Sequence, residues 1–266
     1  MSEDANYYDR FANHQEEPKP SKEKKASFVE STSYSLTKIF LYMFGGLFIT
    51  ASIALGLGAL LDALLIGGNT QLTDTALIIF LAIMIVSAIG LIVMSFVVPI
   101  MAAKDKHSIL VPAIIYSALM GVLMSSITAF IPWFLLGTTF GITSLIFGLM
   151  ALIAFLSKSR LNGLAIAAMG MFMGAMMLSG ILFLMMLLGA ISGEMVWLYW
   201  VISLVLFAAM MLITIWDLAR IKRIAQKGEM SRNLSLYCAY ILYNDFIYIF
   251  LRVLRIVVIV YSKIKR

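Results

Sequence analysis

Three long stretches of this sequence contain neither lysine nor arginine, and they limit the folds open to the chain more than any other feature. They cover residues 39–103, 107–157 and 161–219. The hydrocarbon core of a bilayer is about 30 Å thick, and a helix of about 20 apolar residues crosses it. Each stretch is therefore long enough for two membrane helices and the turn between them. The chain is also 62% hydrophobic, whereas soluble domains are roughly 45–50% apolar, so we predict a membrane protein.

The apolar pattern predicts an all-α membrane domain at residues 38–266, in which seven helices cross the bilayer as one bundle. Turn-rich or basic segments, such as Gly67–Thr75 and Lys104–His107, separate the apolar runs. Residues 1–37 are polar and highly charged, so we predict a disordered cytoplasmic tail there. The expected spans are residues 39–66, 76–103, 109–131, 134–156, 164–191, 195–216 and 234–260.

The basic loops indicate how the chain is oriented in the membrane. The segments 104–107, 157–160 and 217–233 hold two, two and five Lys or Arg, and the three loops on the other side hold none. Because short loops rich in Lys and Arg stay in the cytoplasm, we predict a multi-pass membrane protein with a cytoplasmic N-terminus. The basic end at Ser262–Arg266 disagrees, since seven crossings place it outside. We predict that the last helix crosses the membrane; the alternative is a helix that re-enters on the same side.

Two pairs of glycines spaced four residues apart, Gly137–Gly141 and Gly170–Gly174, lie inside expected helices. This spacing is typical of helices that pack closely in membranes. We expect these glycines to pack within one bundle rather than to join two copies of the chain.

The last expected span carries an acidic residue, Asp245, near its middle. A charged side chain at the centre of a bilayer costs about 2.5–3.5 kcal/mol on insertion scales, and such residues usually mark a path for ions or protons. At about 100° per residue, Cys238 and Arg252 fall within about 20° of Asp245 on the helix surface. Arg252 is therefore a candidate counter-charge, and the polarity of this helix predicts a central position in the bundle. The alternative is a carboxylate that only holds helices together.

A second acid, Asp217, ends the sixth expected span. Taken alone, it is consistent with a solvated acid that pairs with Arg220 three residues further on. If it folds against Asp245, the two carboxylates resist double ionisation, share a proton and titrate as a pair. Carboxylate oxygens also bind hard cations. We therefore predict a pH-sensitive, weak Ca²⁺ site at Asp217 and Asp245, with Ca²⁺ as a permeant or weakly bound ion and no other cofactor.

The sequence lacks the common patterns of catalytic and nucleic-acid-binding proteins. Its two histidines, His14 and His107, and its one cysteine, Cys238, do not have zinc-ligand spacing. The motifs GxSxG and HExxH are absent. A membrane protease with two catalytic aspartates is disfavoured because no Gly-x-Gly-Asp motif occurs. The positive charges lie at helix ends rather than on a soluble face, so we predict neither enzyme activity nor a nucleic-acid partner.

Two segments carry a resemblance to the Bax inhibitor-1 family. WDLARIKRIAQKG is followed by LSLYCAYILYNDFIYIFLRVLRIV, which resembles the family's C-terminal signature. A second, internal similarity runs through Thr143, Phe147, Ser157, Lys158, Leu161 and Gly163. The resemblance covers about residues 35–261 and implies a seven-helix bundle whose last helix is central. It also implies a pH-sensitive Ca²⁺ leak with an aspartate pair as sensor, at Asp217 and Asp245 in this sequence. The kind of tail and the lack of an organellar signal suggest a bacterial plasma (inner) membrane protein.

The resemblance further implies an arginine on the second helix that holds the aspartate pair closed. No Lys or Arg occurs at residues 39–103, so Lys104 is the nearest replacement and Arg252 is an alternative. The acid that the family carries after its Ser/Thr-Lys loop is also missing, since Ser159 and Arg160 follow here. A second function stays open: a membrane-embedded regulator of a quality-control protease or stress response, without transport, for which the tail and the basic inner loop would supply the contacts.

Overall fold

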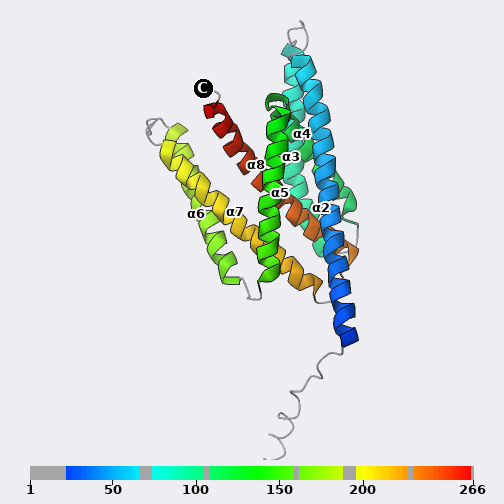
Figure 1. Ribbon diagram of the computed structural model, residues 1–266. Coiled ribbons are helices and arrows are strands. Elements are labelled where there is room, and N and C mark those ends of the chain that lie inside the picture. The colour runs from blue at the N-terminus through cyan, green and yellow to red at the C-terminus, as the bar shows by residue number, and fades with distance from the viewer. Residues whose placement is uncertain are drawn as a thin grey trace, which may run out of the picture.

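A computed structural model describes residues 22–65, 74–104, 108–157, 162–187, 196–226 and 230–264 of the chain. The described residues are helical apart from short connections and contain no strand, which confirms the all-α class. Figure 1 shows long helices that run along one another between two ends of a bundle. The helices are α2 (Lys22–Leu65), α3 (Asp74–Lys104), α4 (Leu110–Phe130), α5 (Trp133–Leu156), α6 (Asn162–Leu187), α7 (Val196–Ala225) and α8 (Arg232–Ile264).

Helix α2 extends further than the apolar pattern predicts. It begins at Lys22, so the part of the predicted disordered tail from Lys22 to Thr37 is helical, while residues 1–21 of that tail lie outside the described residues. Its 44 residues give a length of about 66 Å, well beyond the roughly 30 Å of hydrocarbon. Lys, Glu and Ala are good helix formers in water. Hydropathy therefore located the membrane part of this helix but missed its polar start.

Within the described residues, five helices are long and apolar enough to cross a membrane by length and composition, namely α2, α3, α4, α5 and α7. In α6 the corresponding described segment is shorter, Ile166–Ile181, and α8 is more polar than the others. Helix α8 nevertheless runs unbroken for 33 residues, about 50 Å. It ends at the opposite end of the bundle from the start of α2 (Figure 1). This geometry agrees with a last helix that crosses and not with one that re-enters.

Helix α8 lies at the centre of the bundle, as its polarity predicts. It packs against α2, α3, α4, α5 and α7, while α6 packs on α7, and Figure 1 shows it running between the α6–α7 pair and the α2–α4 group. Leu242 and Ile249 of α8 are fully buried, and the main apolar core contains residues of α2, α4, α5, α7 and α8. The central helix therefore places its one acidic residue inside protein.

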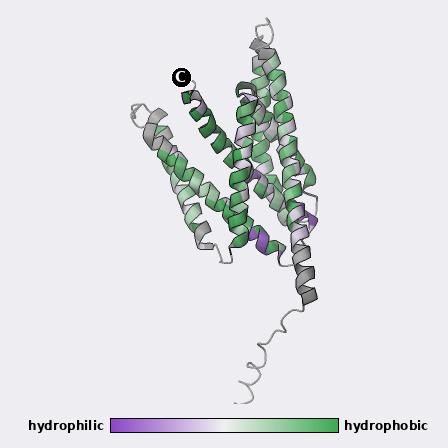
Figure 2. Ribbon diagram, viewed as in Figure 1, coloured by the Kyte–Doolittle hydropathy of each residue, from purple (hydrophilic) through white to green (hydrophobic). Residues whose placement is uncertain are grey.

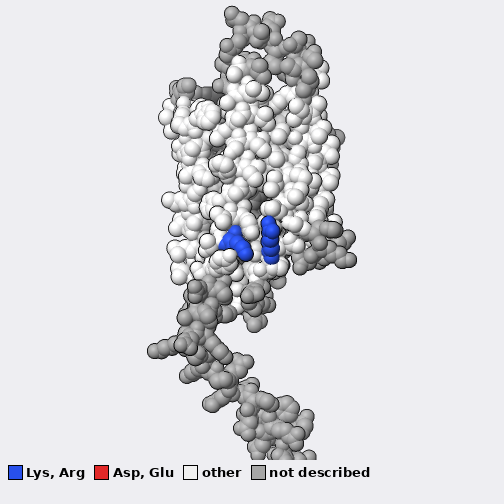
Figure 3. Space-filling model, turned by 90° about the vertical axis from the view of Figure 1, so that its right-hand side faces the viewer, with Lys and Arg blue, Asp and Glu red and all other residues white. Residues whose placement is uncertain are grey.

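The outside of the bundle is apolar over most of its length. Large side chains such as Phe48, Leu156 and Ile166 are more than two-thirds exposed, as expected for surfaces that contact lipid. In Figure 2 the hydrophilic colour is concentrated near the end where α2 begins, on the last turns of α7. On the face in Figure 3, the basic side chains that are drawn lie toward that end, and the rest of the described surface is uncharged.

Close helix contacts depend on glycines other than those in the GxxxG pairs. A Cβ atom on Gly137, Gly141, Gly170 or Gly174 would meet nothing within 4 Å, so the expected packing role of these pairs within the bundle is wrong. A Cβ on Gly121 of α4 would instead lie 2.8 Å from Cβ of Ile53 on α2. The α2–α4 contact therefore needs a glycine, whereas the faces that bear the GxxxG pairs are open.

Candidate functional site

Asp245 is buried in the middle of α8, with 6% of its surface exposed. The groups that act on its carboxyl come from α7: the Asp217 carboxyl by its charge, and the Thr214 hydroxyl as a hydrogen-bonding neighbour. The Thr214 hydroxyl also donates to the Met210 carbonyl oxygen at 2.9 Å, and its one proton serves one acceptor at a time. Oδ2 of Asp245 has no hydrogen-bond partner among the described residues. The acid is thus desolvated and incompletely satisfied.

Asp217 lies inside α7 and not at the start of a loop, because α7 continues to Ala225. The prediction that the helix ends at Trp216 is therefore wrong by more than two turns. Asp217 is three residues after Thr214, so both occupy one face of α7, and only 8% of Asp217 is exposed. This burial argues against an ordinary solvated acid.

The two acids lie close enough to interact by charge, but no hydrogen bond joins them among the described side chains. The Asp217 charge also acts on Cys238, which is seven residues before Asp245 on the same face of α8. The charge of Asp217 thus reaches the stretch of α8 between Cys238 and Asp245 without a direct bond to it. The two acids that the sequence singles out lie on two helices that pack against each other.

The three predicted counter-charges occupy different places. The Arg220 guanidinium lies over the Trp216 ring, 5.3 Å from its centroid, and its charge acts on Asp217. Arg252 instead donates from Nη1 to Oγ of Ser203 at 2.8 Å, which joins α8 to α7. Lys104 is the last residue of α3, and its side chain lies outside the described residues. Of the three predicted counter-charges, Arg220 is thus the one whose charge acts on Asp217.

A basic residue that sequence reasoning missed connects α7 to α5. Nζ of Lys222 donates to the carbonyl oxygen of Phe155 at 2.6 Å. This oxygen belongs to the last turn of α5, where carbonyl groups have no partner within the helix. The basic composition of the loop is visible in the sequence, but the partner on another helix is not. This bond holds the last turns of α7, which follow Asp217, against the end of α5.

Neutral polar side chains join α8 to α2 and α4. Thr50 of α2 donates to the Ser117 carbonyl oxygen at 2.9 Å, and its Oγ1 lies 2.6 Å from the Tyr243 hydroxyl. Because the one hydroxyl proton of Thr50 points to Ser117, Tyr243 is the donor in the second bond. The Tyr116 hydroxyl donates to Oδ1 of Asn244 at 2.7 Å. Tyr243 and Asn244 directly precede Asp245, so these bonds fix the turn of α8 that carries the acid.

We expect Thr50→Val to destabilise the protein by about 0.5–2 kcal/mol, the range found for hydrogen bonds between membrane helices. Valine keeps the shape of threonine but leaves the buried Tyr243 hydroxyl without its acceptor. Tyr243→Phe removes the other partner, and the double variant should be less unstable than the sum of the two. Unfolding in mixed micelles measures all three. Strictly additive losses would show that the Thr50–Tyr243 bond contributes nothing.

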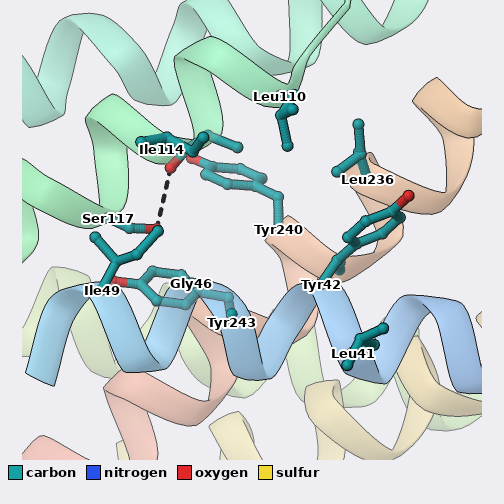
Figure 4. Close-up of a pocket in the computed structure, with 13 residues that line it drawn as sticks. Leu41, Tyr42, Gly46, Ile49, Leu110, Ile114, Ser117, Leu236, Tyr240 and Tyr243 are labelled. Atoms are coloured by element: carbon teal, nitrogen blue, oxygen red, sulfur yellow. Dashed lines mark hydrogen bonds between the residues drawn. The ribbon is translucent and has the colours of Figure 1, made fainter.

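Two pockets flank the central helix on the side of α2 and α4. The first, of about 170 Å³, lies between α2, α4 and α8. Figure 4 shows Tyr243 and Ser117 near Gly46 of α2, with Tyr240 and Tyr42 further along the pocket. The dashed bond there runs from the Ser117 hydroxyl to the Ala113 carbonyl oxygen, 3.0 Å long. The second pocket, of about 370 Å³, is apolar and is lined by residues of α2, α4, α5 and α8.

The chemistry available at the buried acids is that of oxygen ligands. Ca²⁺ is held tightly by six to eight oxygens, and the described residues contain no group of three or more acidic, histidine or cysteine side chains that could hold a metal ion. Two carboxyls and a threonine hydroxyl therefore fit a proton, or a weakly held hard cation that keeps part of its hydration. They do not form a resident metal centre.

An all-helical bundle whose central helix carries a buried acid defines a polytopic membrane protein with an internal polar site. The model of the family described as "Inhibitor of apoptosis-promoting Bax1" matches residues 32–261. The chain therefore belongs to the Bax inhibitor-1 family, as its C-terminal motif indicates. No curated protein and no solved structure matches the chain.

Proposed function

We propose that the protein is a passive leak path for small cations, with Ca²⁺ as the leading ion, and that protons compete with the cation at Asp217 and Asp245. The observation that carries this proposal is the buried Asp245 carboxyl, whose Oδ2 has no partner. An ionisable group held inside a membrane domain is expensive and usually functional. A carboxylate that only holds helices together would have hydrogen-bond partners for both of its oxygens.

The second acid supports a role in proton competition. Two carboxylates that interact by charge are not both ionised as readily as isolated ones, so a proton or a cation between them lowers their mutual repulsion. Lowering the pH supplies protons that displace the cation. We therefore expect cation entry to fall as the pH falls, and to rise again when the pH is restored.

The test is Ca²⁺ entry into liposomes that contain the purified protein and a trapped Ca²⁺-sensitive dye. We expect entry well above that of protein-free liposomes, and a reversible decrease on acidification of both compartments. Entry no greater than in protein-free liposomes would overturn the leak and favour the regulatory alternative. Entry that does not change with pH would overturn the proton competition alone.

We further propose that the N-terminus lies in the cytoplasm, and the basic residues support this orientation. Arg220, Lys222, Arg223 and Arg232 all lie at the end of the bundle where α7 ends and α8 begins. This is also the end where α2 begins (Figure 1). By the positive-inside rule, we expect an epitope tag at the N-terminus to be protected from protease outside intact cells, and a tag at the C-terminus to be cleaved. Cleavage of the N-terminal tag would invert the proposed orientation.

A further inference from the structure

Thr143 of α5 is fully buried, and its hydroxyl oxygen has no hydrogen-bond partner among the described residues. Two other fully buried threonines in this bundle donate to the carbonyl oxygen four residues earlier. Thr139, one turn away on the same buried face, donates to Leu135 at 2.7 Å, and Thr214 donates to Met210 at 2.9 Å. Thr143 has the same kind of carbonyl within its helix but does not use it. Its hydroxyl is therefore directed to something else.

Three aromatic rings place Thr143 level with the acid site. Phe140 and Phe147 lie about one turn before and after it on α5. Both rings pack on Phe246, each with centroids 5.6 Å apart, and Phe246 directly follows Asp245. Thr143 and Asp245 therefore lie at neighbouring levels of two helices, α5 and α8, that pack against each other.

Two of the unpartnered polar atoms of the described side chains lie on packed helices at this level. They are Oγ1 of Thr143 on α5 and Oδ2 of Asp245 on α8, and these two helices pack on each other. A third, Nε1 of Trp216, belongs to a residue about 160° around α7 from Thr214, the neighbour of Asp245, and so faces away from the acid. Buried polar groups are nearly always satisfied by protein or by ordered water. Two unsatisfied groups at one level of two packed helices indicate a common partner that both donates and accepts hydrogen bonds, which water does.

We propose that Thr143 and Asp245 bound one hydrated site between α5 and α8, and that the Thr143 hydroxyl is a further ligand for water and for a hydrated cation on the path through Asp245. The role in conduction rests on the proposed function, whereas the hydration does not. The second, apolar pocket is lined by Phe140 and Phe246 but not by Thr143. The hydrated site is thus separate from that pocket.

Conduction is tested by removing only the hydroxyl. Thr143→Val keeps the shape of the side chain, and Thr139→Val makes the same change at a fully buried threonine whose hydroxyl is bonded within its own helix. We expect Thr143→Val to lower Ca²⁺ entry by about tenfold, equivalent to about 1.4 kcal/mol, whereas Thr139→Val and Thr143→Ser stay near the parent rate. Equal rates for the two valine variants would overturn the role of Thr143 in conduction.

Hydration is tested without any flux measurement. Thr143→Cys and Thr139→Cys are each treated with Ag⁺ in liposomes. Each variant is then unfolded in detergent, and its free thiols are labelled with a maleimide. The parent protein, with its buried Cys238, gives the baseline labelling. We expect Ag⁺ to protect the added thiol at 143 and not at 139. Equal labelling of both would show a dry junction and overturn the hydrated site. If Ag⁺ protects the thiol at position 143 but the protein conducts no Ca²⁺, the hydrated site stands and only the proposed leak is overturned.

Discussion

Asparagine in place of Asp245 is expected to lower Ca²⁺ entry by about 10- to 100-fold, because interactions with a charged group contribute about 1.5–3 kcal/mol. The amide has nearly the same shape as the carboxyl but carries no negative charge and binds cations weakly. It is also cheaper to bury than an ionised carboxylate. We therefore expect Asp245→Asn to fold, with a thermal midpoint no lower than that of the parent. The residual entry should no longer change with pH.

Asp217→Asn is the comparison variant, since it removes the second acid and leaves the first. Asp217 is buried to a similar extent and interacts with Asp245 by charge. Without it, Asp245 no longer has a like charge nearby, so protonation should become harder and the fall in entry should move to lower pH. Entry should persist at neutral pH. If Asp245→Asn folds and conducts like the parent, the buried acid is structural and the proposed path lies elsewhere.

The spans were predictable because charge in a bilayer has a large and local cost. Stretches without Lys or Arg marked the membrane parts of the six helices from α2 to α7, and the polarity of α8 marked its central position. The ends of α2 and α7 were missed for a related reason. Outside the bilayer, a segment such as the one from Trp216 to Ala225 of α7 stays helical because of its helix propensity and its contacts with other helices. A hydropathy pattern reports neither of these.

The acid pair was predictable and its surroundings were not. Asp217 and Asp245 stand out because few acids lie within the apolar runs. Thr50 does not, and Thr143 stood out only as part of a family similarity, without a role. Threonine is common in membrane helices, and its role depends on which neighbour its hydroxyl reaches. That neighbour is set by the rotation and tilt of two helices, and Arg252 illustrates the point. Its place on the helix face was known, yet its partner is Ser203 on α7.

The contact between α2 and α4 gives the second large expected effect, at Gly121. A Cβ atom there would lie 2.9 Å from the backbone oxygen of Thr50, besides its approach to Ile53. Backbone does not move aside as a flexible side chain does, so Gly121→Ala must push α2 and α4 apart. Overpacking of this kind typically costs about 1–3 kcal/mol. Thr50 also holds Tyr243, so the shift should loosen the turn of α8 before Asp245.

We therefore expect Gly121→Ala to lower the thermal midpoint by several degrees, at about 2–4 °C per kcal/mol for a chain of this size. It should also change Ca²⁺ entry although Gly121 touches neither acid. The control is Gly141→Ala on α5, where a Cβ meets nothing within 4 Å. Alanine is favoured over glycine in a helix by about 1 kcal/mol, so this control should keep or raise the midpoint. Equal midpoints for the two variants would mean that α2 and α4 are held together less closely than this geometry requires.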